Sequence, residues 1–303
     1  MIYDVIIVGG SFAGLSAAMQ LVRARRQVLV IDAGQPRNRF ADHSHGVLGH
    51  DGKSGFELLG TARDQLACYP TFSILSATVS EVLPHAGRFT ATLDTGESVE
   101  GRRVLLSTGV SDPVPATPGL MERWGKTVLP CPYCHGYEIG GGSIGVLASS
   151  PLAVHQAGLI ADWGDVTLFT DGKIELDQEM RLKLARRKVN IETQSVVGLE
   201  GPTPAIDAVL LSDGRKVAVR ALFLGMHTRQ TSPLAKQLGC AIDENPGCFV
   251  IRTDEWKQTT VPGIYAAGDA AIPMANITFA SADGVRAGVG MHHSLIAEET
   301  AVG

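Results

Sequence analysis

Two cysteines separated by two residues, Cys131 and Cys134, are the side chains of this sequence best suited to redox chemistry. Thiols at this spacing can close a small disulfide across one helical turn. Pro132, between them, suits the first turn of a helix, and the positive end of that helix lowers a thiol pKa and favours attack by the thiolate. His135 follows directly and could carry the proton that thiol exchange moves. We therefore predict a redox-active pair with His135 as its acid and base.

Half of a zinc site and an idle structural pair are the two alternatives for these cysteines. Zinc needs two further ligands, and the three other cysteines, Cys68, Cys240 and Cys248, are scattered without a second close pair. We expect these three to be ordinary packing residues and no metal to bind. An odd cysteine count with one close pair also differs from a secreted disulfide framework, which favours a reducing, cytoplasmic location.

The N-terminus carries the pattern of a dinucleotide-binding unit. An apolar run over 2–8 leads into a glycine-rich turn over 9–14, a helical pattern follows, and an apolar run over 28–31 ends in an acidic residue. In such a unit, backbone N–H groups at the turn hold a pyrophosphate, and the acidic residue accepts hydrogen bonds from ribose hydroxyls. Serine replaces the middle glycine of the usual turn. We predict cofactor contacts from Gly9, Gly10, Ser11, Ala13, Gly14 and Asp32.

A second set of candidate ligand contacts lies near the C-terminus. An apolar strand over 263–267 ends in Gly268 and Asp269, where the glycine admits a ligand closely and the carboxylate can accept from its hydroxyls. A helical pattern from about Asn276 to Ile296 would direct its N-terminal N–H groups at an electron-rich oxygen. A flavin dinucleotide needs all of these contacts, for its pyrophosphate, its ribityl chain and its ring carbonyl. We predict FAD as the cofactor.

A second strand–helix–strand pattern has the same order but a different turn. It begins at 144–147 and continues through a helix over about 151–163 and a strand over 166–169. Its turn has no glycine at the first two positions of the usual motif, and Pro151 removes an N–H near the helix start. No arginine cluster follows to hold a 2′-phosphate. We predict an α/β fold with two doubly wound nucleotide-binding-type domains, of which the second binds NAD(P)H poorly.

The composition excludes several classes of function. The chain has 303 residues and a net charge of −5, and no run of lysine and arginine exceeds three residues. We therefore expect neither a nucleic acid nor an anionic membrane surface as partner. No apolar stretch reaches the roughly 18–20 residues of a membrane helix, and the N-terminus lacks the features of a signal peptide. The length favours two domains.

Together these motifs resemble the low-molecular-weight thioredoxin reductase-like flavoproteins over essentially the whole chain. The resemblance implies a split FAD domain, formed by 1–112 and 230–303, with an NAD(P)-type domain inserted at 113–229. It also implies a homodimer, and a position of Cys134 against the flavin. The matching segments are 9–14 with Asp32, Ser107-Thr108-Gly109, 131–134, and 261–269 followed by Ile277-Thr278, so that Thr108, Gly109 and Ile277 join the predicted cofactor-binding residues.

The block at 131–138, CPYCHGYE, is similar to one branch in particular. Ordinary thioredoxin reductases carry an aspartate where His135 stands, whereas this block is similar to the dithiol oxidases that close the disulfides of gliotoxin- and holomycin-type natural products. That branch also lacks working pyridine-nucleotide motifs. The resemblance implies oxidation of a dithiol, with Cys131 exchanging with substrate, Cys134 passing electrons to FAD, and oxygen or another carrier as acceptor. The substrate is expected to be a small dithiol or a thioredoxin-like protein.

Three other functions are compatible with the same residues. The first is an NAD(P)H-dependent reductase of thioredoxin or a small disulfide, working in the opposite direction. The second is a disulfide oxidoreductase linked to ferredoxin or a second flavin, and the third is a redox-responsive binding protein that holds FAD without turnover. Three histidines precede Asp51 in a loop, where they either line a pocket or, as we favour, are solvated: His43, His45 and His50.

Overall fold

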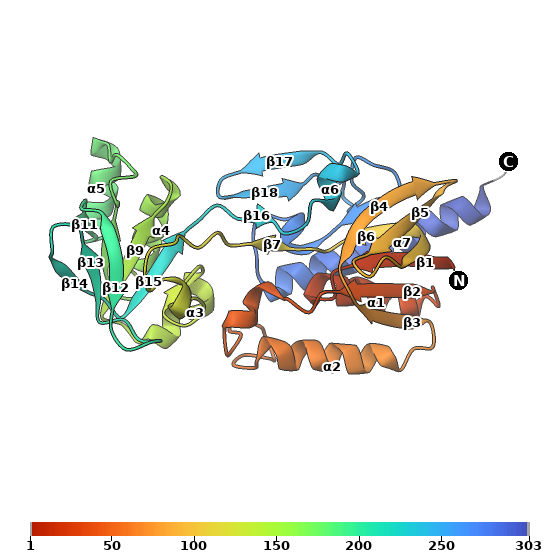
Figure 1. The fold of residues 1–303 in the computed structure, drawn as a ribbon, viewed down its shortest axis with the longest axis horizontal. Coiled ribbons are helices and arrows are strands. Elements are labelled where there is room, and N and C mark those ends of the chain that lie inside the picture. Colours follow the sequence, from red (N-terminus) through yellow and green to blue (C-terminus); the bar gives the residue numbers. More distant parts are fainter. Residues whose placement is uncertain (1, 302–303) are drawn as a thin grey trace. The chain divides into compact units, whose positions relative to one another are not determined.

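The computed structural model describes residues 2–301 (Figure 1). Contacts divide the chain into two compact units. The first unit comprises the chain up to Arg37, the segment Phe56–Ser111 and the chain from Arg229 onward, and the second comprises Asn38–Gly55 and Asp112–Thr228. Each unit combines helices and a sheet around hydrophobic cores of its own. Each therefore positions its own functional residues.

The first unit is organised around a sheet with the strand order β3-β2-β1-β6-β5-β4, in which β19 also pairs with β6. Its central strands are apolar at nearly every position because both faces are covered: Ile7 and Val30 contribute to one core, Ile6 and Leu29 to the other. All pairings are parallel except those of β4 with β5 and β5 with β6. The strands are β1 (Ile2–Val8), β2 (Val28–Asp32), β3 (Phe72–Ser76), β4 (Val79–His85), β5 (Arg88–Leu93), β6 (Ser98–Leu106) and β19 (Ile264–Ala266).

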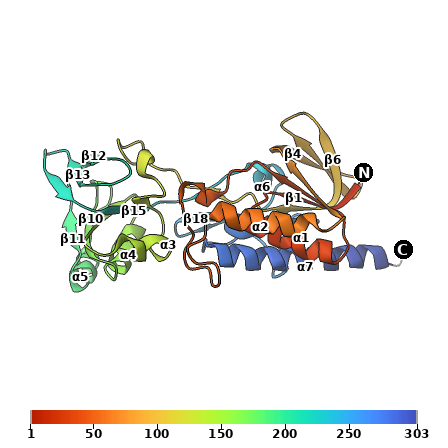
Figure 2. The same cartoon turned by 90° about the horizontal axis from the view of Figure 1, so that it is seen from below.

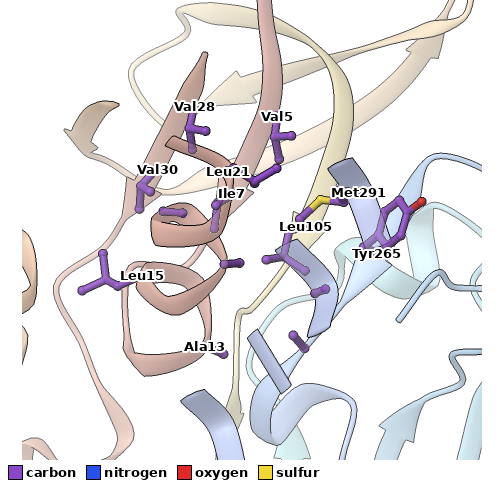
Figure 3. Packing of buried hydrophobic residues seen from close by; sticks show 14 of the residues in the cluster. Val5, Ile7, Ala13, Leu15, Leu21, Val28, Val30, Leu105, Tyr265 and Met291 are labelled. Atoms are coloured by element: carbon purple, nitrogen blue, oxygen red, sulfur yellow. The ribbon is translucent and has the colours of Figure 1, made fainter. Parts of the chain in front are cut away.

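Helices α1 and α7 run side by side against one face of this sheet (Figure 2). Two glycines of α7 permit the close approach: a Cβ at Gly284 would lie 2.0 Å from the Ala13 carbonyl oxygen, and one at Gly288 would lie 2.8 Å from the Ala17 carbonyl oxygen. The core between helices and sheet includes Val5, Ile7, Leu21, Val30 and Met291 (Figure 3). The helices are α1 (Phe12–Arg23), α2 (Gly55–Ala67), α6 (Leu234–Gln237) and α7 (Ile277–Thr300).

Short elements complete the first unit. β7 pairs with β16 and β17 pairs with β18, both antiparallel, and the turn after β19 is a 3-10 helix, η3. Another 3-10 helix, η1, spans the first change of unit. These elements are η1 (Arg37–Phe40), β7 (Val110–Ser111), β16 (Arg229–Gln230), β17 (Ile242–Asn245), β18 (Cys248–Ile251) and η3 (Gly268–Ala270).

The second unit contains a parallel sheet with the order β11-β10-β9-β15-β8 and a separate antiparallel sheet, β12-β13-β14. Because parallel strands end at the same edge, the turns after β8 and β9 lie on one side of the sheet. The predicted pair of α/β modules is thus confirmed. The elements are η2 (Met121–Arg123), β8 (Val128–Leu129), α3 (Pro132–Ile139), β9 (Ser143–Ala148), α4 (Leu152–Ile160), β10 (Asp165–Phe169), α5 (Gln178–Arg186), β11 (Asn190–Glu192), β12 (Val196–Glu200), β13 (Ala208–Leu211), β14 (Lys216–Ala218) and β15 (Ala221–Gly225).

The segment Asn38–Gly55 packs with the second unit, whereas the prediction places residues 1–112 together in the FAD domain. Phe40 lies so close to Gly125 that a Cβ on the glycine would be 2.6 Å from the Phe40 Cβ. Asp42 forms an ion pair with Lys126. The segment is therefore attached by both apolar and charged contacts, none of which has a local sequence signal.

Two helices differ in length from the prediction. α4 ends at Ile160 rather than near residue 163, because the chain turns at Gly164, where a Cβ would lie 2.4 Å from the Gly142 carbonyl oxygen. α7 continues to Thr300 rather than stopping near residue 296, because its acidic last turn binds arginines of the sheet and loops. These ion pairs are Arg26–Glu299, Arg102–Glu298, Arg102–Glu299 and Arg103–Glu298. Within residues 2–301, no helix has both the length and the apolar character needed to cross a membrane.

Candidate flavin cradle and redox-active dithiol

The two cysteines of the predicted pair form a disulfide at the start of α3, with Cα atoms 5.4 Å apart. Cys131 is the N-cap residue with extended backbone, and Pro132 occupies the first helical turn. Proline is favoured there because the missing N–H would have no partner within the helix. The sulfur atoms thus lie at the positive end of the α3 dipole, which stabilises a thiolate when the disulfide opens.

Trp163 holds α3 in place. Gly136, on the buried side of α3, leaves no room for a side chain, since a Cβ there would lie 2.8 Å from the Trp163 ring. The ring of Tyr133 meets the same indole edge to face, with centroids 5.5 Å apart. Directly before the disulfide in sequence, the Pro130 carbonyl oxygen accepts a hydrogen bond of 3.4 Å from the Gln156 amide of α4. The dithiol is therefore mounted on a rigid element.

His135 follows Cys134 directly on α3, and its surroundings change its pKa. Burial lowers the pKa of His135, the nearby Glu138 carboxylate raises it, and His45 lowers it. Burial is the largest of these effects, so the imidazole is neutral near pH 7 and can accept a proton. This environment is compatible with the predicted acid–base role.

One of the three loop histidines reaches the dithiol helix. His45 Nδ1 lies 3.4 Å from a carboxylate oxygen of Glu138 and 3.5 Å from one of Asp51, and its side chain is only 21% exposed. His43 and His50 are exposed, as expected for solvated loop histidines. His45 differs because the segment 38–55 packs on the second unit, which sequence spacing does not indicate.

The predicted glycine-rich turn forms a tight cradle between β1 and α1. Gly9 has φ +105°, and a Cβ there would lie 2.3 Å from the Ser107 carbonyl oxygen. A Cβ at Gly14 would lie 2.0 Å from the Gly9 carbonyl oxygen. The Ser107 hydroxyl donates to the same oxygen at 2.8 Å, which fixes the turn. A dinucleotide requires such close access to backbone N–H groups.

Asp32 lies beside this turn at the end of β2. Its carboxylate accepts a hydrogen bond of 3.0 Å from the Gly10 N–H and forms an ion pair of 2.7 Å with Arg63 of α2. Sequence reasoning missed Arg63, because a residue 31 positions away on another element has no local signal. Its Nε atom is buried and makes no hydrogen bond within the described residues. A bound dinucleotide would offer it acceptors.

The C-terminal contact set lies next to the first turn. Gly268 has φ +73°, and a Cβ there would lie 2.8 Å from the Ala13 Cβ. Asp269 pairs with Arg37 at 3.0 Å, a second arginine that sequence reasoning missed. The structure thus brings together two segments more than 250 residues apart in sequence, as the FAD prediction requires.

The other predicted cofactor residues occupy the surroundings of the same cradle. Gly109 has φ +68°, and the Thr108 N atom would lie 3.3 Å from a Cβ on Gly9. Asn276 caps α7 by accepting a hydrogen bond of 2.7 Å from the Phe279 N–H. Ser11 is the N-cap of α1, Ala13 lies in the first turn of α1, and Ile277 is the first residue of α7. The tight glycine turn, with the carboxylates of Asp32 and Asp269 and the Arg63 Nε atom beside it, fits a dinucleotide such as FAD.

The corresponding turn of the second unit lacks the tight glycine geometry and makes contacts of its own. The Ser149 hydroxyl donates to the Gly225 carbonyl oxygen, and Pro151 is the N-cap of α4 without a side-chain cap. After β10, Lys173 forms an ion pair of 2.6 Å with Asp171, whose carboxylate also accepts from the Val196 N–H at 2.7 Å. Lys173, the one basic residue directly after β10 in sequence, is therefore already neutralised.

The remaining cysteines differ from one another. Cys240 and Cys248 are buried, as predicted for packing residues, and burial raises the pKa of both thiols. The prediction was wrong for Cys68, which is exposed just after the end of α2. Within residues 2–301, no group of three or more histidine, cysteine or acidic side chains is arranged to hold a metal ion.

A dinucleotide cradle on one parallel-sheet unit and a dithiol at a helix N-terminus on another define a flavin-dependent disulfide oxidoreductase of the thioredoxin reductase type. The chain belongs to the pyridine nucleotide-disulphide oxidoreductase family, whose model matches residues 3–286. Members of this family bind FAD, which confirms the cofactor prediction.

Individual relatives cover nearly the whole chain. Thioredoxin reductase tcpT from Claviceps purpurea is 33% identical over 314 residues, which cover 98% of this chain and 95% of the relative. A solved oxidoreductase from Agrobacterium tumefaciens is 45% identical with a TM-score of 0.93, covering 98% of this chain and 99% of that one. The crystal structure of HlmI is 35% identical with a TM-score of 0.93, covering 98% and 93%. The resemblance to thioredoxin reductase-like flavoproteins is thus confirmed.

Proposed function

We propose that the protein oxidises a dithiol to a disulfide and passes the electrons through the Cys131–Cys134 pair to bound FAD. One observation supports this direction: the second unit keeps its dithiol helix, while its turn carries Ser149, which donates to the Gly225 carbonyl oxygen, and Pro151, which has no N–H to donate. A nicotinamide donor would need that turn, because its pyrophosphate binds to backbone N–H groups at a helix start.

Oxidation of the substrate dithiol by the Cys131–Cys134 disulfide needs no further reactant. A substrate thiolate attacks the Cys131 sulfur, the Cys131–Cys134 bond breaks, and Cys134 leaves as a thiolate. The second substrate thiol gives its proton to His135 and attacks the mixed disulfide, which releases the substrate disulfide and the Cys131 thiolate. The substrate has then lost two electrons and two protons. FAD, held by the glycine turn with Asp32 and Asp269, would supply the two-electron acceptor for the reduced pair, with oxygen or another carrier as final acceptor.

The chain's own residues support each part of this scheme. The dipole of α3 stabilises both cysteine thiolates, and the neutral, partly buried His135 accepts the substrate proton. Tyr133, between the two cysteines, and Tyr137, one turn later on α3, have exposed rings that offer apolar contact to a substrate. These features suit a small dithiol or a thioredoxin-like protein as substrate. We infer that the active form is a cytoplasmic homodimer.

Anaerobic stopped-flow spectroscopy of the flavin tests the proposal. A reducing dithiol such as dithiothreitol should bleach the flavin absorbance rapidly, NADPH and NADH should bleach it negligibly, and oxygen should restore it with release of peroxide. A protein with both cysteines changed to serine is the control, and dithiol should not bleach it. Rapid, saturable bleaching by NADPH would overturn the oxidase assignment. Very slow restoration by oxygen would identify another carrier, such as a ferredoxin or a second flavoprotein, as the acceptor.

An NAD(P)H-dependent reductase is the second candidate function. The family description, which refers to pyridine nucleotides, and the name of the relative tcpT, which refers to a thioredoxin reductase, favour it. The second unit also retains the parallel sheet of a nucleotide-binding domain. The same stopped-flow experiment separates the two directions. If neither dithiols nor nicotinamides change the flavin, the protein is a redox-responsive FAD carrier instead.

A further inference from the structure

A buried lysine lies behind the C-terminal part of the flavin cradle, and the thiol chemistry does not use it. The Lys257 side chain is only 6% exposed, and its backbone is left-handed, with φ +69°. Its carbonyl oxygen accepts from the Ala266 N–H at 3.0 Å, which fixes Lys257 to β19. Because a buried ammonium requires a partner, its contacts indicate what it holds.

Lys257 contacts both an acidic residue and the end of the cofactor turn. Its Nζ atom lies 3.2 Å from Asp283 Oδ1 of α7 and 3.5 Å from the Ala271 carbonyl oxygen, directly after η3. The Asp283 carboxylate, 8% exposed, accepts a hydrogen bond of 3.0 Å from the Gly268 N–H through its other oxygen. One ion pair therefore holds both ends of the turn Gly268–Ala271.

The same ion pair lies where the cradle's segments meet. Gly284, next to Asp283, contacts the backbone of Ala13 in the first turn of α1, and Gly268 contacts the Ala13 side chain. Asp269 lies inside the held turn, with its carboxylate paired to Arg37 at 3.0 Å. A displacement of the turn would move Asp269 and Gly268 together, relative to the N-terminal turn.

We propose that Lys257 and Asp283 are positioning residues for FAD, forming a buried clamp that fixes the turn Gly268–Ala271 in its cofactor-binding shape. A buried ion pair contributes little net stability compared with apolar side chains, but the loss of one partner leaves an uncompensated charge. The pair is therefore better explained by its geometric role than by stability. The inference rests on FAD as cofactor and is independent of the direction of the thiol reaction.

The test compares FAD release with unfolding. In the Lys257→Met variant, FAD should leave the holoprotein at least about tenfold faster than in the wild type, measured as the rise of free-flavin fluorescence under conditions where circular dichroism shows folded protein. Asp283→Asn should show a similar loss, because Lys257 then lacks its charged partner. If the variants lower Tm but release FAD at the wild-type rate, the pair is merely structural and the proposal fails.

Arg103→Met is the matched control. Arg103 is also buried and also binds α7, donating to the Ser294 hydroxyl at 2.9 Å and pairing with Glu298 at 2.6 Å, but at the far end of the helix from Gly268. This variant should lower Tm without changing the rate of FAD release. Equal acceleration of FAD release in Arg103→Met would show that any damage to α7 has this effect and would overturn the clamp.

A double variant allows the same measurement if the single variants do not fold. Lys257→Met combined with Asp283→Asn removes both buried charges, and the new amide oxygen can still accept from the Gly268 N–H. Its Tm should be closer to that of the wild type than the Tm of either single variant. FAD should still leave about tenfold faster, because the Ala271 end of the turn is no longer held. Wild-type retention of FAD in the folded double variant would contradict the proposal.

Discussion

The two strand–turn–helix units of this chain share a fold but differ in the turn. In the first unit, Gly9 and Gly14 leave no space for a Cβ, because the turn packs tightly against Ser107 and against its own backbone. In the second, Ser149 donates to the chain's own Gly225 and Pro151 begins the helix. Both units nevertheless build sheets whose central strands are parallel and buried. The sheet depends on apolar strands and tolerates a changed turn, whereas nucleotide binding depends on a few turn residues.

The largest expected effect comes from adding one methyl group to the cradle. Gly14→Ala should abolish FAD retention and destabilise the first unit by several kcal/mol, because the new Cβ would lie 2.0 Å from the Gly9 carbonyl oxygen. Gly60→Ala, in α2 of the same unit, is the control, since no atom lies within 4 Å of its added Cβ. That control should stabilise the protein by about 0.5–1 kcal/mol. Absorbance of purified protein and thermal unfolding measure both outcomes, and a yellow Gly14→Ala protein would contradict the cradle.

Next in size is the loss of turnover when either cysteine is replaced. Cys131→Ser and Cys134→Ser should both eliminate dithiol oxidation, because each variant can no longer close the disulfide. We also expect a difference between them in the absorption spectrum. Cys131→Ser leaves Cys134 as a lone thiolate and should give a long-wavelength charge-transfer band, whereas Cys134→Ser should not. A band that follows Cys131 instead would reverse the two roles.

Removing His135 should slow thiol exchange without releasing FAD. His135→Ala should reduce the rate of flavin reduction by dithiol by about 10²-fold, the typical contribution of a positioned acid–base group. His155→Ala serves as the control, because that exposed histidine lies on a different helix, α4. Stopped-flow rates measure the effect. An unchanged rate and pH profile in His135→Ala would exclude the proton role.

A smaller effect, a gain in affinity for NADPH, should follow from replacing Pro151 in the second turn. Pro151→Ala restores a backbone N–H at the start of α4, and one charge-assisted hydrogen bond is worth about 1.5–3 kcal/mol. The apparent affinity for NADPH should rise about ten- to a hundredfold from its low starting value. The measurement is the NADPH concentration that half-saturates flavin reduction. No gain in this variant would show that the missing N–H of Pro151 is not what weakens nucleotide binding.

The smallest expected effect is a shift in the pH profile. Since burial lowers the pKa of His135, the neutral base persists below pH 6.5, and the rate should fall only when the pH drops through that lowered pKa. Glu138 raises this pKa and His45 lowers it. Glu138→Gln should therefore move the acid limb to lower pH and His45→Gln to higher pH. Shifts in the same direction in both variants would contradict this electrostatic assignment.

The sequence predicts what depends on local patterns. The 9–14 turn, the α3 dithiol and the alternation of strands and helices follow from residue types at short spacings, and they lie where expected. Arg63 with Asp32, and Lys257 with Asp283, could not be predicted, because each pair joins residues from different elements through side-chain contacts. The same holds for His45, whose contact with Glu138 depends on how a loop packs.

The attachment of Asn38–Gly55 to the second unit determines how the molecule can be divided. An excised fragment covering only Asp112–Thr228 would lack the partners of Gly125, Lys126 and Glu138. Separating the two units at the level of the gene therefore takes four cuts instead of two. The second unit is a discontinuous domain made of two chain segments. A fragment covering Asp112–Thr228 would therefore need a peptide spanning 38–55 to complete it.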